Sequence, residues 1–456
     1  MDNRKTGQTT LRVSNQCSLE HTSQELANRL KKHLTIANPK YTAAKRYGRW
    51  IGKKMAPELY FFREEKDVFH FPRGFANQAV MLHRELHGED PMIIDERLLL
   101  PKIELIFKGE LRSYQQEAIG AITARSFGVL EAGTGSGKTV MALGVIAERK
   151  QPTLIVVHSK ELLYQWVARI EEFLGEEAGI IGDGKFCPQP LSVAIVNTAR
   201  KLLAELTWRF GQIIVDECHR VPASLFTDVV SGFNSHYMLG LSATAFCRED
   251  GMTKLIYYYM GDRVHGVDME RLARSGAVIR PSYEARETSF SYGFTGEYSA
   301  MIKALAGDAN RNELISRDIL GAVADGHEGT VLVVSDRVAH CELLADKLNR
   351  SGVRAVVLTG KTNPARRVEI VGEVRDGKVP VLLSTLQLIG EGFDCPGLTT
   401  LVLVTPIKFQ GRLLQVVGRI MRPAVGKSAR VIDYHDVHVP LLRKSSLERM
   451  HILQSL

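Results

Sequence analysis

Short, continuous apolar runs recur from residue 127 onward and are separated by stretches with helical periodicity. The first set comprises VLEA (129–132), TLIVVH (153–158), VAIVNT (193–198), IIVDE (213–217) and MLGLSAT (238–244). The second set comprises TVLVVS (330–335), AVVLTG (355–360), VLLST (381–385), LVLVT (401–405) and VIDY (431–434). Runs that are continuous rather than alternating are typical of strands buried on both faces of a parallel sheet. The pattern therefore predicts two α/β domains, each built on a parallel sheet.

The rest of the chain has a different pattern. Residues 19–34 predict a short helix, while LYFF (59–62) and VFHF (68–71) flank the charged segment REEKD as the strands of a hairpin would. Residues 261–310 lack strong periodicity and are expected to hold a linker. We therefore expect three domains, by the usual relation of length to domain number. They are a small α+β accessory domain at 1–105, a first α/β domain at 106–262, and a second at 263–456 that includes the linker.

Composition narrows the class of protein. The 456 residues are 45% hydrophobic and 24% charged, as in ordinary globular proteins. The net charge of +8 favours a polyanionic partner, although a basic protein without such a partner remains an alternative. The six cysteines are scattered without a CxxC pair, so we expect reduced thiols and a cytoplasmic location. No apolar run approaches the length that spans a bilayer, so we expect no membrane partner.

The segment AGTGSGKT (132–139) lies between an apolar run and a helical pattern at 140–149. Strand, glycine-rich loop and helix are the context of a phosphate-binding loop, in which glycines use backbone torsions that most residues avoid. Ala132 stands where the pattern usually has glycine, and a small residue is expected to fit. Lys138 can reach the outer phosphates, and the Thr139 hydroxyl can bind Mg²⁺. The residues expected to surround the nucleotide are Gly133, Thr134, Gly135, Ser136, Gly137, Lys138 and Thr139.

An acidic pair ends the run IIVDE. Beside a phosphate loop, Asp216 would hold Mg²⁺ and Glu217 would orient or deprotonate the attacking water. His219 follows in the same segment and could couple the nucleotide to SAT (242–244), or could be a surface histidine.

A third candidate element is QVVGRIMR (415–422). Arg419 and Arg422 are three residues apart, so on a helix both would project from one face. Guanidinium groups suit the charge that spreads over the γ-phosphate oxygens during hydrolysis. An ordinary basic helix face is the alternative.

The ordered set of segments resembles the superfamily 2 helicases and translocases from residue 111 to the C-terminus. Similar to motifs I, Ia, Ib, II and III are AGTGSGKT, VVHSKELLYQW (156–166), VNTAR (196–200), DECH (216–219) and SAT. Similar to motifs IV, V and VI are VLVVSDR (331–337), STLQLIGEGFDCP (384–396) and QVVGRIMRP (415–423). The resemblance implies two tandem RecA-like domains that hydrolyse ATP with Mg²⁺.

The resemblance also implies roles for single residues. Gln115 of LRSYQ (111–115) would read adenine, with Ser113 where the family often has proline. Three further groups carry over: nucleotide-facing residues Gly392 and Asp394; coupling residues His219, Ser242, Thr244 and Gln415; and strand-contacting residues Thr198 and Thr385.

Finer likenesses rest on fewer residues. RED (248–250) is similar to a segment of eukaryotic transcription-repair helicases, with a charged loop as the alternative. NPKYTAAKRYGRW (38–50) and PRGF (72–75) resemble the leading domain of small phage and poxvirus helicases, most of all tailed-phage branch-migration helicases. Residues 29–54 carry nine Lys or Arg and no Asp or Glu. We expect Arg46, Arg49 and Trp50 to grip DNA, the alternative being a solvated basic face with core aromatics.

The functional expectation is an ATP-driven motor that remodels forked or branched DNA without sequence preference, with 3′-to-5′ polarity implied by the family. Other replication or recombination proteins are possible partners. A motor acting on RNA or transcription complexes is one alternative. A nucleotide-gated DNA-binding protein without unwinding is another, of a different class.

Overall fold

The computed structural model describes residues 8–46, 50, 55–219, 223–243, 252–294, 296–325, 329–390, 397–424 and 426–456. The chain divides into two compact units. One comprises residues 1–132 and 137–266, and the other comprises residues 267–456 together with 133–136. Within the described residues, no helix combines the length and apolar character needed to cross a membrane.

The first unit begins with a small α+β region built on a five-stranded sheet of order β5-β6-β2-β1-β7. Its elements are β1 (Thr10–Val13), β2 (Gln16–Glu20), α1 (Gln24–His33), β3 (Thr35–Ala37), α2 (Pro39–Arg46), β4 (Glu58–Tyr60), β5 (Arg63–Glu65), β6 (Val68–Pro72), the 3₁₀ turn η1 (Arg73–Phe75), α3 (Ala76–His87) and β7 (Met92–Asp95). Its core is formed by apolar side chains from the sheet and from α1, including Leu11, Leu26, Phe69 and Phe71.

Two local expectations for this region are wrong. The helix expected at 19–34 begins only at Gln24, because the Ser23 hydroxyl accepts a hydrogen bond from the Leu26 N–H and caps the first turn. The hairpin is not formed by LYFF: β5 pairs with β6, whereas β4 pairs with β3. Lys66 and Asp67 both have positive φ, at 48° and 70°, which is the backbone of a tight two-residue hairpin turn.

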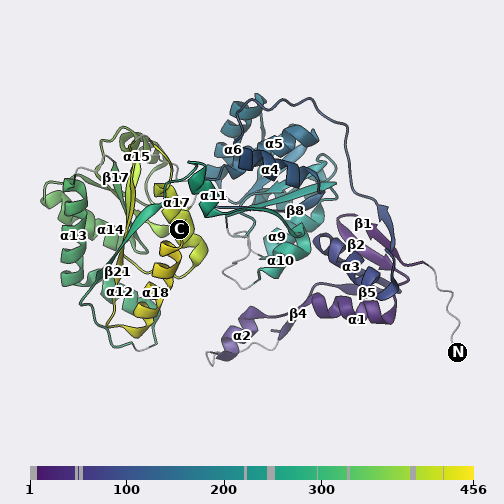
Figure 1. The fold of residues 1–456 in the computed structure, drawn as a ribbon, viewed down its shortest axis with the longest axis horizontal. Helices are drawn as coiled ribbons and strands as arrows, with labels where there is room; N and C mark the ends of the chain where they lie inside the picture. The colour runs from purple at the N-terminus through teal and green to yellow at the C-terminus, as the bar shows by residue number, and fades with distance from the viewer. Residues whose placement is uncertain are drawn as a thin grey trace. The chain divides into compact units, whose positions relative to one another are not determined.

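The parallel sheet of the first unit has the order β11-β10-β12-β9-β13-β14-β8-β15. Its region comprises α4 (Ser113–Thr123), β8 (Phe127–Ala132), α5 (Lys138–Arg149), β9 (Thr153–Val157), α6 (Lys160–Leu174), β10 (Gly179–Gly182), β11 (Lys185–Cys187), β12 (Leu191–Ile195), α7 (Val196–Lys201), α8 (Leu203–Leu206), β13 (Gln212–Val215), α9 (Ala223–Gly232), β14 (Tyr237–Ser242), α10 (Lys254–Met260) and β15 (Arg263–Val267). Helices α4, α5 and α6 cover one face of this sheet, and α9 and α10 cover the other (Figure 1).

The five apolar runs expected as strands of this sheet all contain strands, although four of the runs extend past the end of their strand. β12 ends at Ile195, so residues 196–198 begin α7 instead of ending a strand. The hairpin of β10 and β11 was not foreseen, because its glycine-rich and charged residues show no apolar run. Strands β10, β12, β9, β13, β14 and β8 are parallel, so their carboxyl ends gather at one edge of the sheet.

The PRGF segment attaches the α+β region to this sheet. The buried Arg73 guanidinium donates to the Ser235 carbonyl at 2.8 Å. Burial lowers the pKa of Arg73 to about 10. The Cβ position of Gly74 lies 2.4 Å from the Gly261 nitrogen, so only glycine allows this approach to the end of α10. The Tyr258 hydroxyl of α10 donates in turn to the His33 carbonyl.

The second unit contains a six-stranded sheet of order β16-β21-β20-β17-β19-β18, parallel in every described pairing. Its elements are α11 (Met269–Arg274), β16 (Pro281–Glu287), α12 (Tyr298–Gly307), α13 (Ala309–Ala324), β17 (Thr330–Ser335), α14 (Val338–Arg350), β18 (Ala355–Leu358), α15 (Pro364–Arg375), β19 (Val381–Thr385), α16 (Leu386–Gly390), β20 (Leu398–Leu403), α17 (Gln410–Ile420), β21 (Ala429–His435) and α18 (Pro440–Gln454). Helices α13 and α14 lie on one side of the sheet, and α17 and α18 on the other (Figure 1).

The second set of apolar runs is confirmed as strands, and the stretch 261–310, expected to hold a linker, contains the point at 266/267 where the chain passes from the first unit to the second. That stretch contributes β15, α11, β16 and α12. β16 has the sequence PSYEARE and is an edge strand with partly exposed side chains, so its polar residues gave no apolar run.

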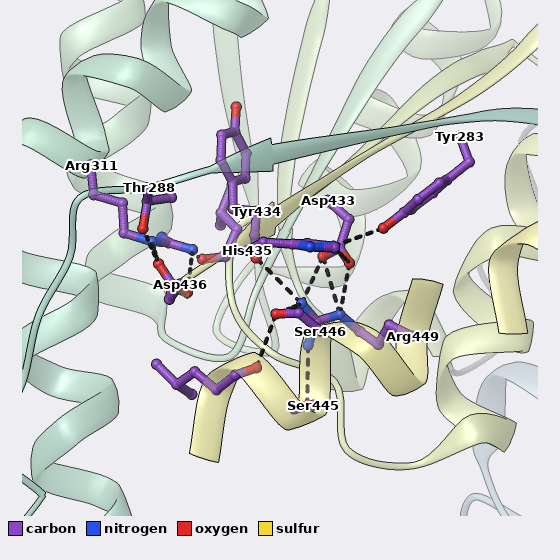
Figure 2. Close-up of polar contacts among 12 residues, drawn as sticks. Tyr283, Thr288, Arg311, Asp433, Tyr434, His435, Asp436, Ser445, Ser446 and Arg449 are labelled. Carbon is purple, nitrogen blue, oxygen red and sulfur yellow. Dashed lines mark hydrogen bonds and ion pairs between the residues drawn. The ribbon is translucent and has the colours of Figure 1, made fainter. Parts of the chain in front are cut away.

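A buried charged network fixes the end of β21 (Figure 2). Arg449 of α18 donates to both oxygens of Asp433, at 2.9 Å and 3.1 Å, and both side chains are almost fully buried. Arg311 of α13 donates to Asp436 at 2.8 Å and to the Val404 carbonyl at 2.8 Å. The network therefore ties two helices to the carboxyl end of the same strand.

Candidate functional site

The phosphate loop connects β8 to α5. Gly135 and Gly137 have φ of 87° and 78°, in the left-handed region that favours glycine. The expectation of such torsions is thus correct for these two glycines and wrong for Gly133, whose φ is not positive. Ala132 is the fully buried last residue of β8, which explains why a small apolar residue fits there.

Lys138 is the first residue of α5, directly after the loop. Its ammonium group donates to the Ala132 carbonyl at 3.0 Å and lies 3.9 Å from Glu217 Oε1. Glu217 itself has a φ of 47°, unusual for a residue with a Cβ and found where the backbone is held by its surroundings. The loop lysine and the acidic pair predicted from distant segments are thus neighbours at the carboxyl edge of the sheet.

Asp216 follows β13, and hydrogen bonds fix both its backbone N–H and its carboxylate. Its backbone N–H donates to the Val156 carbonyl at the end of β9. Oδ1 accepts from the Glu217 N–H at 2.9 Å, and Oδ2 accepts from the Trp166 indole N–H at 2.8 Å. Burial, followed by the nearby Glu217 charge, raises the pKa of Asp216 to about 6, while Trp166 and Lys138 act in the opposite direction.

His219 links the acidic segment to the next strand. Its Nδ1 lies 2.8 Å from the Ser242 hydroxyl at the end of β14 and 3.4 Å from Glu217 Oε2. The side chain is only 8% exposed, so the alternative of a surface histidine is excluded. Thr244, the third member of this expected coupling group, lies outside the described residues.

Gln115 lies beside the phosphate loop. It is buried on α4, where its Oε1 accepts from the Arg112 N–H at 2.9 Å. Its Nε2 is 2.5 Å from the Cβ position of Gly137, so a side chain at Gly137 would collide with the glutamine. The segment predicted to read adenine and the phosphate loop are therefore in contact within the first unit.

In the second unit, α17 carries Gln415 and Arg419, both at least nine-tenths buried. Arg419 Nε donates to the Ile389 carbonyl at 3.2 Å. The expectation that Arg419 and Arg422 share one helical face is wrong, because α17 ends at Ile420. Pro423 follows Arg422, and the residue before a proline is disfavoured in helical conformation.

The remaining predicted residues are dispersed. Thr198 is half-buried on α7, and Thr385 is the half-buried last residue of β19. Trp50 is 86% exposed, so it is not a core aromatic. Arg46 ends α2. The side chain of Arg46, and Arg49, Gly392 and Asp394, lie outside the described residues.

Thr139 and Asp216 were predicted to hold Mg²⁺. Their hydroxyl and carboxylate oxygens are the hard ligands that Mg²⁺ prefers. The donor set fits this ion. Trp166, which bonds to Asp216, is a functional candidate that sequence reasoning missed, because a tryptophan in an amphipathic helix is most simply a core residue.

In sequence and in fold, the chain is similar to known proteins. Residues 108–246 match the family model "Type III restriction enzyme, res subunit", and residues 313–424 match "Helicase conserved C-terminal domain". The chain is 30% identical over 385 residues to "DNA 3'-5' translocase XPB2" of Sulfurisphaera tokodaii, covering 75% of this chain and 84% of the relative. It is 26% identical over 298 residues to "Probable helicase D10" of Escherichia phage T5, covering 64% of each. The solved structure of S. cerevisiae Dbp5 bound to RNA and ADP BeF3 covers 75% of this chain and 86% of its own, with a TM-score of 0.55 at 14% identity, which supports the fold alone.

The chain belongs to the superfamily 2 helicases. Its two parallel sheets are the tandem RecA-like domains of that class, as expected from the sequence. It is an enzyme, an ATP-hydrolysing helicase, with relatives among phage and transcription-repair helicases.

Proposed function

We propose that this helicase translocates on DNA, 3′ to 5′, and remodels forked or branched DNA in recombination, replication or repair. One observation carries the proposal. Lys138, Glu217 and the His219–Ser242 pair gather at the carboxyl ends of the neighbouring strands β8, β13 and β14, as ATP-driven strand movement requires. The archaeal relative named as a DNA 3′-5′ translocase supports the choice of DNA and of polarity.

Each side chain at the carboxyl edge of the first parallel sheet has its own task in ATP hydrolysis. The Lys138 ammonium pairs with the outer phosphates in place of its present partner, the Ala132 carbonyl. Thr139 and Asp216 would hold Mg²⁺, which would neutralise charge on the phosphates. Glu217 orients or deprotonates the attacking water. The Ser242–His219 hydrogen bond links the state of this acidic segment to β14.

Arg419 and Arg422 are proposed to stabilise the charge that develops on the γ-phosphate. Guanidinium groups suit this task, since they donate several hydrogen bonds and stay charged. Hydrolysis and release of the γ-phosphate would remove its contact with these guanidinium groups. Repeated loss and recovery of that contact drives the strand through the motor.

The strand itself is proposed to contact Thr198 and Thr385 through its phosphates. Such contacts carry no base information, which suits a motor that moves over any sequence. Gln415 and Thr244 are proposed to couple these contacts to the nucleotide, with Gly392 and Asp394 facing it. The action takes place in the cytoplasm, with other replication or recombination proteins as possible partners.

ATPase and strand-displacement assays on single-stranded DNA, forked DNA, four-way junctions and RNA test the proposal. We expect hydrolysis to be stimulated by DNA, and forks and four-way junctions to be remodelled. Hydrolysis without DNA stimulation would contradict the motor. Stronger stimulation by RNA would indicate the RNA or transcription-complex alternative, and DNA binding with no strand displacement would indicate a nucleotide-gated binding protein.

The basic N-terminal segment is tested separately. Replacing Arg46, Arg49 and Trp50 with alanine is expected to weaken four-way junction binding while basal ATPase is kept. The matched control is Trp208→Ala, which removes a tryptophan that is 58% exposed elsewhere in the same unit. Equal junction affinity of the triple variant and the control would refute this role for the segment.

A further inference from the structure

The indole of Trp166 bonds directly to the acidic residue that the proposed function places at Mg²⁺. Trp166 lies on α6, is 2% exposed, and donates its N–H to Asp216 Oδ2 at 2.8 Å. A buried indole N–H needs an acceptor. Here the acceptor is a carboxylate oxygen of the candidate metal site.

The bond completes the orientation of the Asp216 carboxylate. Oδ1 is fixed by the N–H of Glu217, from the same chain segment, and Oδ2 is fixed by the helix α6. Rotation of the carboxyl group about its Cβ–Cγ bond would break both hydrogen bonds. A ligand held from two sides keeps its remaining lone pairs in fixed directions, which is how outer partners tune a metal site.

We infer that Trp166 is a positioning residue for Asp216, which fixes the direction in which the carboxylate presents its oxygens to Mg²⁺ and makes that direction depend on the position of α6. The inference rests on the proposed role of Asp216. α6 starts beside β9 at the same edge of the sheet, where Ser159 caps it by accepting from the Leu162 N–H. The cap fixes where α6 begins, and the helix carries the indole of Trp166 that donates to Asp216.

A purely structural role makes a different prediction. If Trp166 only fills the core, its replacement by another aromatic ring lowers stability but leaves the Mg²⁺ dependence of nucleotide binding unchanged. If Trp166 positions Asp216, loss of the N–H weakens the Mg²⁺-dependent part of binding alone. Trp166→Phe separates the two, because it keeps an apolar ring and removes the donor.

The first experiment titrates Mg²⁺ into full-length protein with a fluorescent ADP analogue. In Trp166→Phe, the Mg²⁺ concentration at half-saturation should rise about tenfold, as outer partners of metal ligands typically affect affinity. Binding in EDTA should be unchanged, and the exposed-site control Trp208→Phe should behave as the unaltered protein. An unchanged Mg²⁺ dependence, or an equal loss with and without Mg²⁺, would overturn the inference.

The second experiment leaves Trp166 in place. The chain has three tryptophans, and the other two, Trp50 and Trp208, are exposed. In a Trp50→Phe, Trp208→Phe background, emission therefore reports Trp166 alone. Mg²⁺ with ADP should change that emission, and addition of Asp216→Asn should abolish the change. Constant emission at saturating Mg²⁺ and ADP would count against the inference.

The two hypotheses fail differently. If the unaltered protein binds the ADP analogue equally well with and without Mg²⁺, the proposed role of Asp216 is wrong. If binding by the unaltered protein depends on Mg²⁺ but Trp166→Phe matches it, only the positioning role of Trp166 is wrong.

Discussion

The Lys138 ammonium lies 3.9 Å from Glu217 Oε1, although Lys138 begins α5 and Glu217 follows β13. The same ammonium donates to the Ala132 carbonyl at 3.0 Å. Lys138 is thus held between the phosphate loop and the acidic segment, where it can exchange a backbone carbonyl for a phosphate oxygen. The relationship makes Lys138 the first residue to test.

Lys138→Ala should lower ATP hydrolysis about 100-fold or more, the usual effect of removing one preorganised donor from a developing charge. DNA binding should remain largely intact, because the side chain faces the loop and the acids. Steady-state ATPase and filter binding measure the two effects. Lys150→Asn is the control, since Lys150 caps the other end of α5 and its ion pair with Glu104 is exposed. A Lys138→Ala enzyme with normal turnover would exclude the proposed site.

The buried Asp216 should make nucleotide binding weaker at acid pH. Its pKa is raised to about 6, so the carboxyl takes up a proton as the pH falls through about 6 and loses the charge that holds Mg²⁺. Mg²⁺-dependent binding of the ADP analogue should therefore weaken below that pH and be constant above about 7. Titrations at a series of pH values, repeated in EDTA, measure this. If binding weakened equally at low pH in EDTA, the pH dependence would come from another group.

Arg419→Ala should reduce hydrolysis about 1,000-fold, the lower range for a guanidinium that stabilises the transition state of phosphoryl transfer. ATP binding should persist, because the phosphate loop is unaltered. Single-turnover hydrolysis and nucleotide binding distinguish these steps. Arg350→Ala, at the exposed end of α14, is the control. If Arg419→Ala hydrolysed ATP normally, the proposed role of Arg419 at the γ-phosphate would be wrong.

The sequence predicted the parts of the fold that depend on local pattern. Buried strands such as β13 and β19 show as apolar runs, and the phosphate loop shows as glycines between a strand and a helix. Strands at or next to a sheet edge were missed, because β16 is polar and β10 is rich in glycine. β16 takes its strand conformation from pairing with the distant β21, which a local pattern does not record.

In the candidate site, too, the features with a local sequence signal were predicted and those that depend on a distant partner were not. The nearness of Lys138 and Glu217 was predicted, because each belongs to a segment with its own chemical signature. The Trp166–Asp216 bond was not, because an indole signals burial and says nothing of its partner. The prediction for Arg422 was wrong because it assumed that the helix continues to residue 422. α17 ends at Ile420, shortly before Pro423.

Gly74→Ala should destabilise the attachment of the α+β region to the first parallel sheet. The added methyl would lie 2.4–2.7 Å from backbone atoms of residues 257–261, which cannot move aside as a flexible side chain can. We expect the free energy of unfolding to fall by about 2 kcal/mol, as it does when other cores are overpacked. Urea unfolding measures it. Gly120→Ala is the control, because its Cβ position on α4 has no neighbour within 4 Å and alanine favours the helix. Equal stability of the two variants would show that the PRGF contact is not tight in solution.

The Asp433–Arg449 pair should stabilise α18 only as a complete pair (Figure 2). Arg449→Met leaves the fully buried Asp433 carboxylate without its guanidinium partner and should lower the free energy of unfolding by about 3–5 kcal/mol. Asp433→Leu combined with Arg449→Met should recover most of that loss, because the uncompensated charge is gone. A double-mutant cycle by urea unfolding measures the coupling, with Arg443→Met on the exposed face of the same helix as the control. Additive losses in the double variant would show that the two side chains contribute independently, and that the geometry of the pair is not what holds the helix to β21.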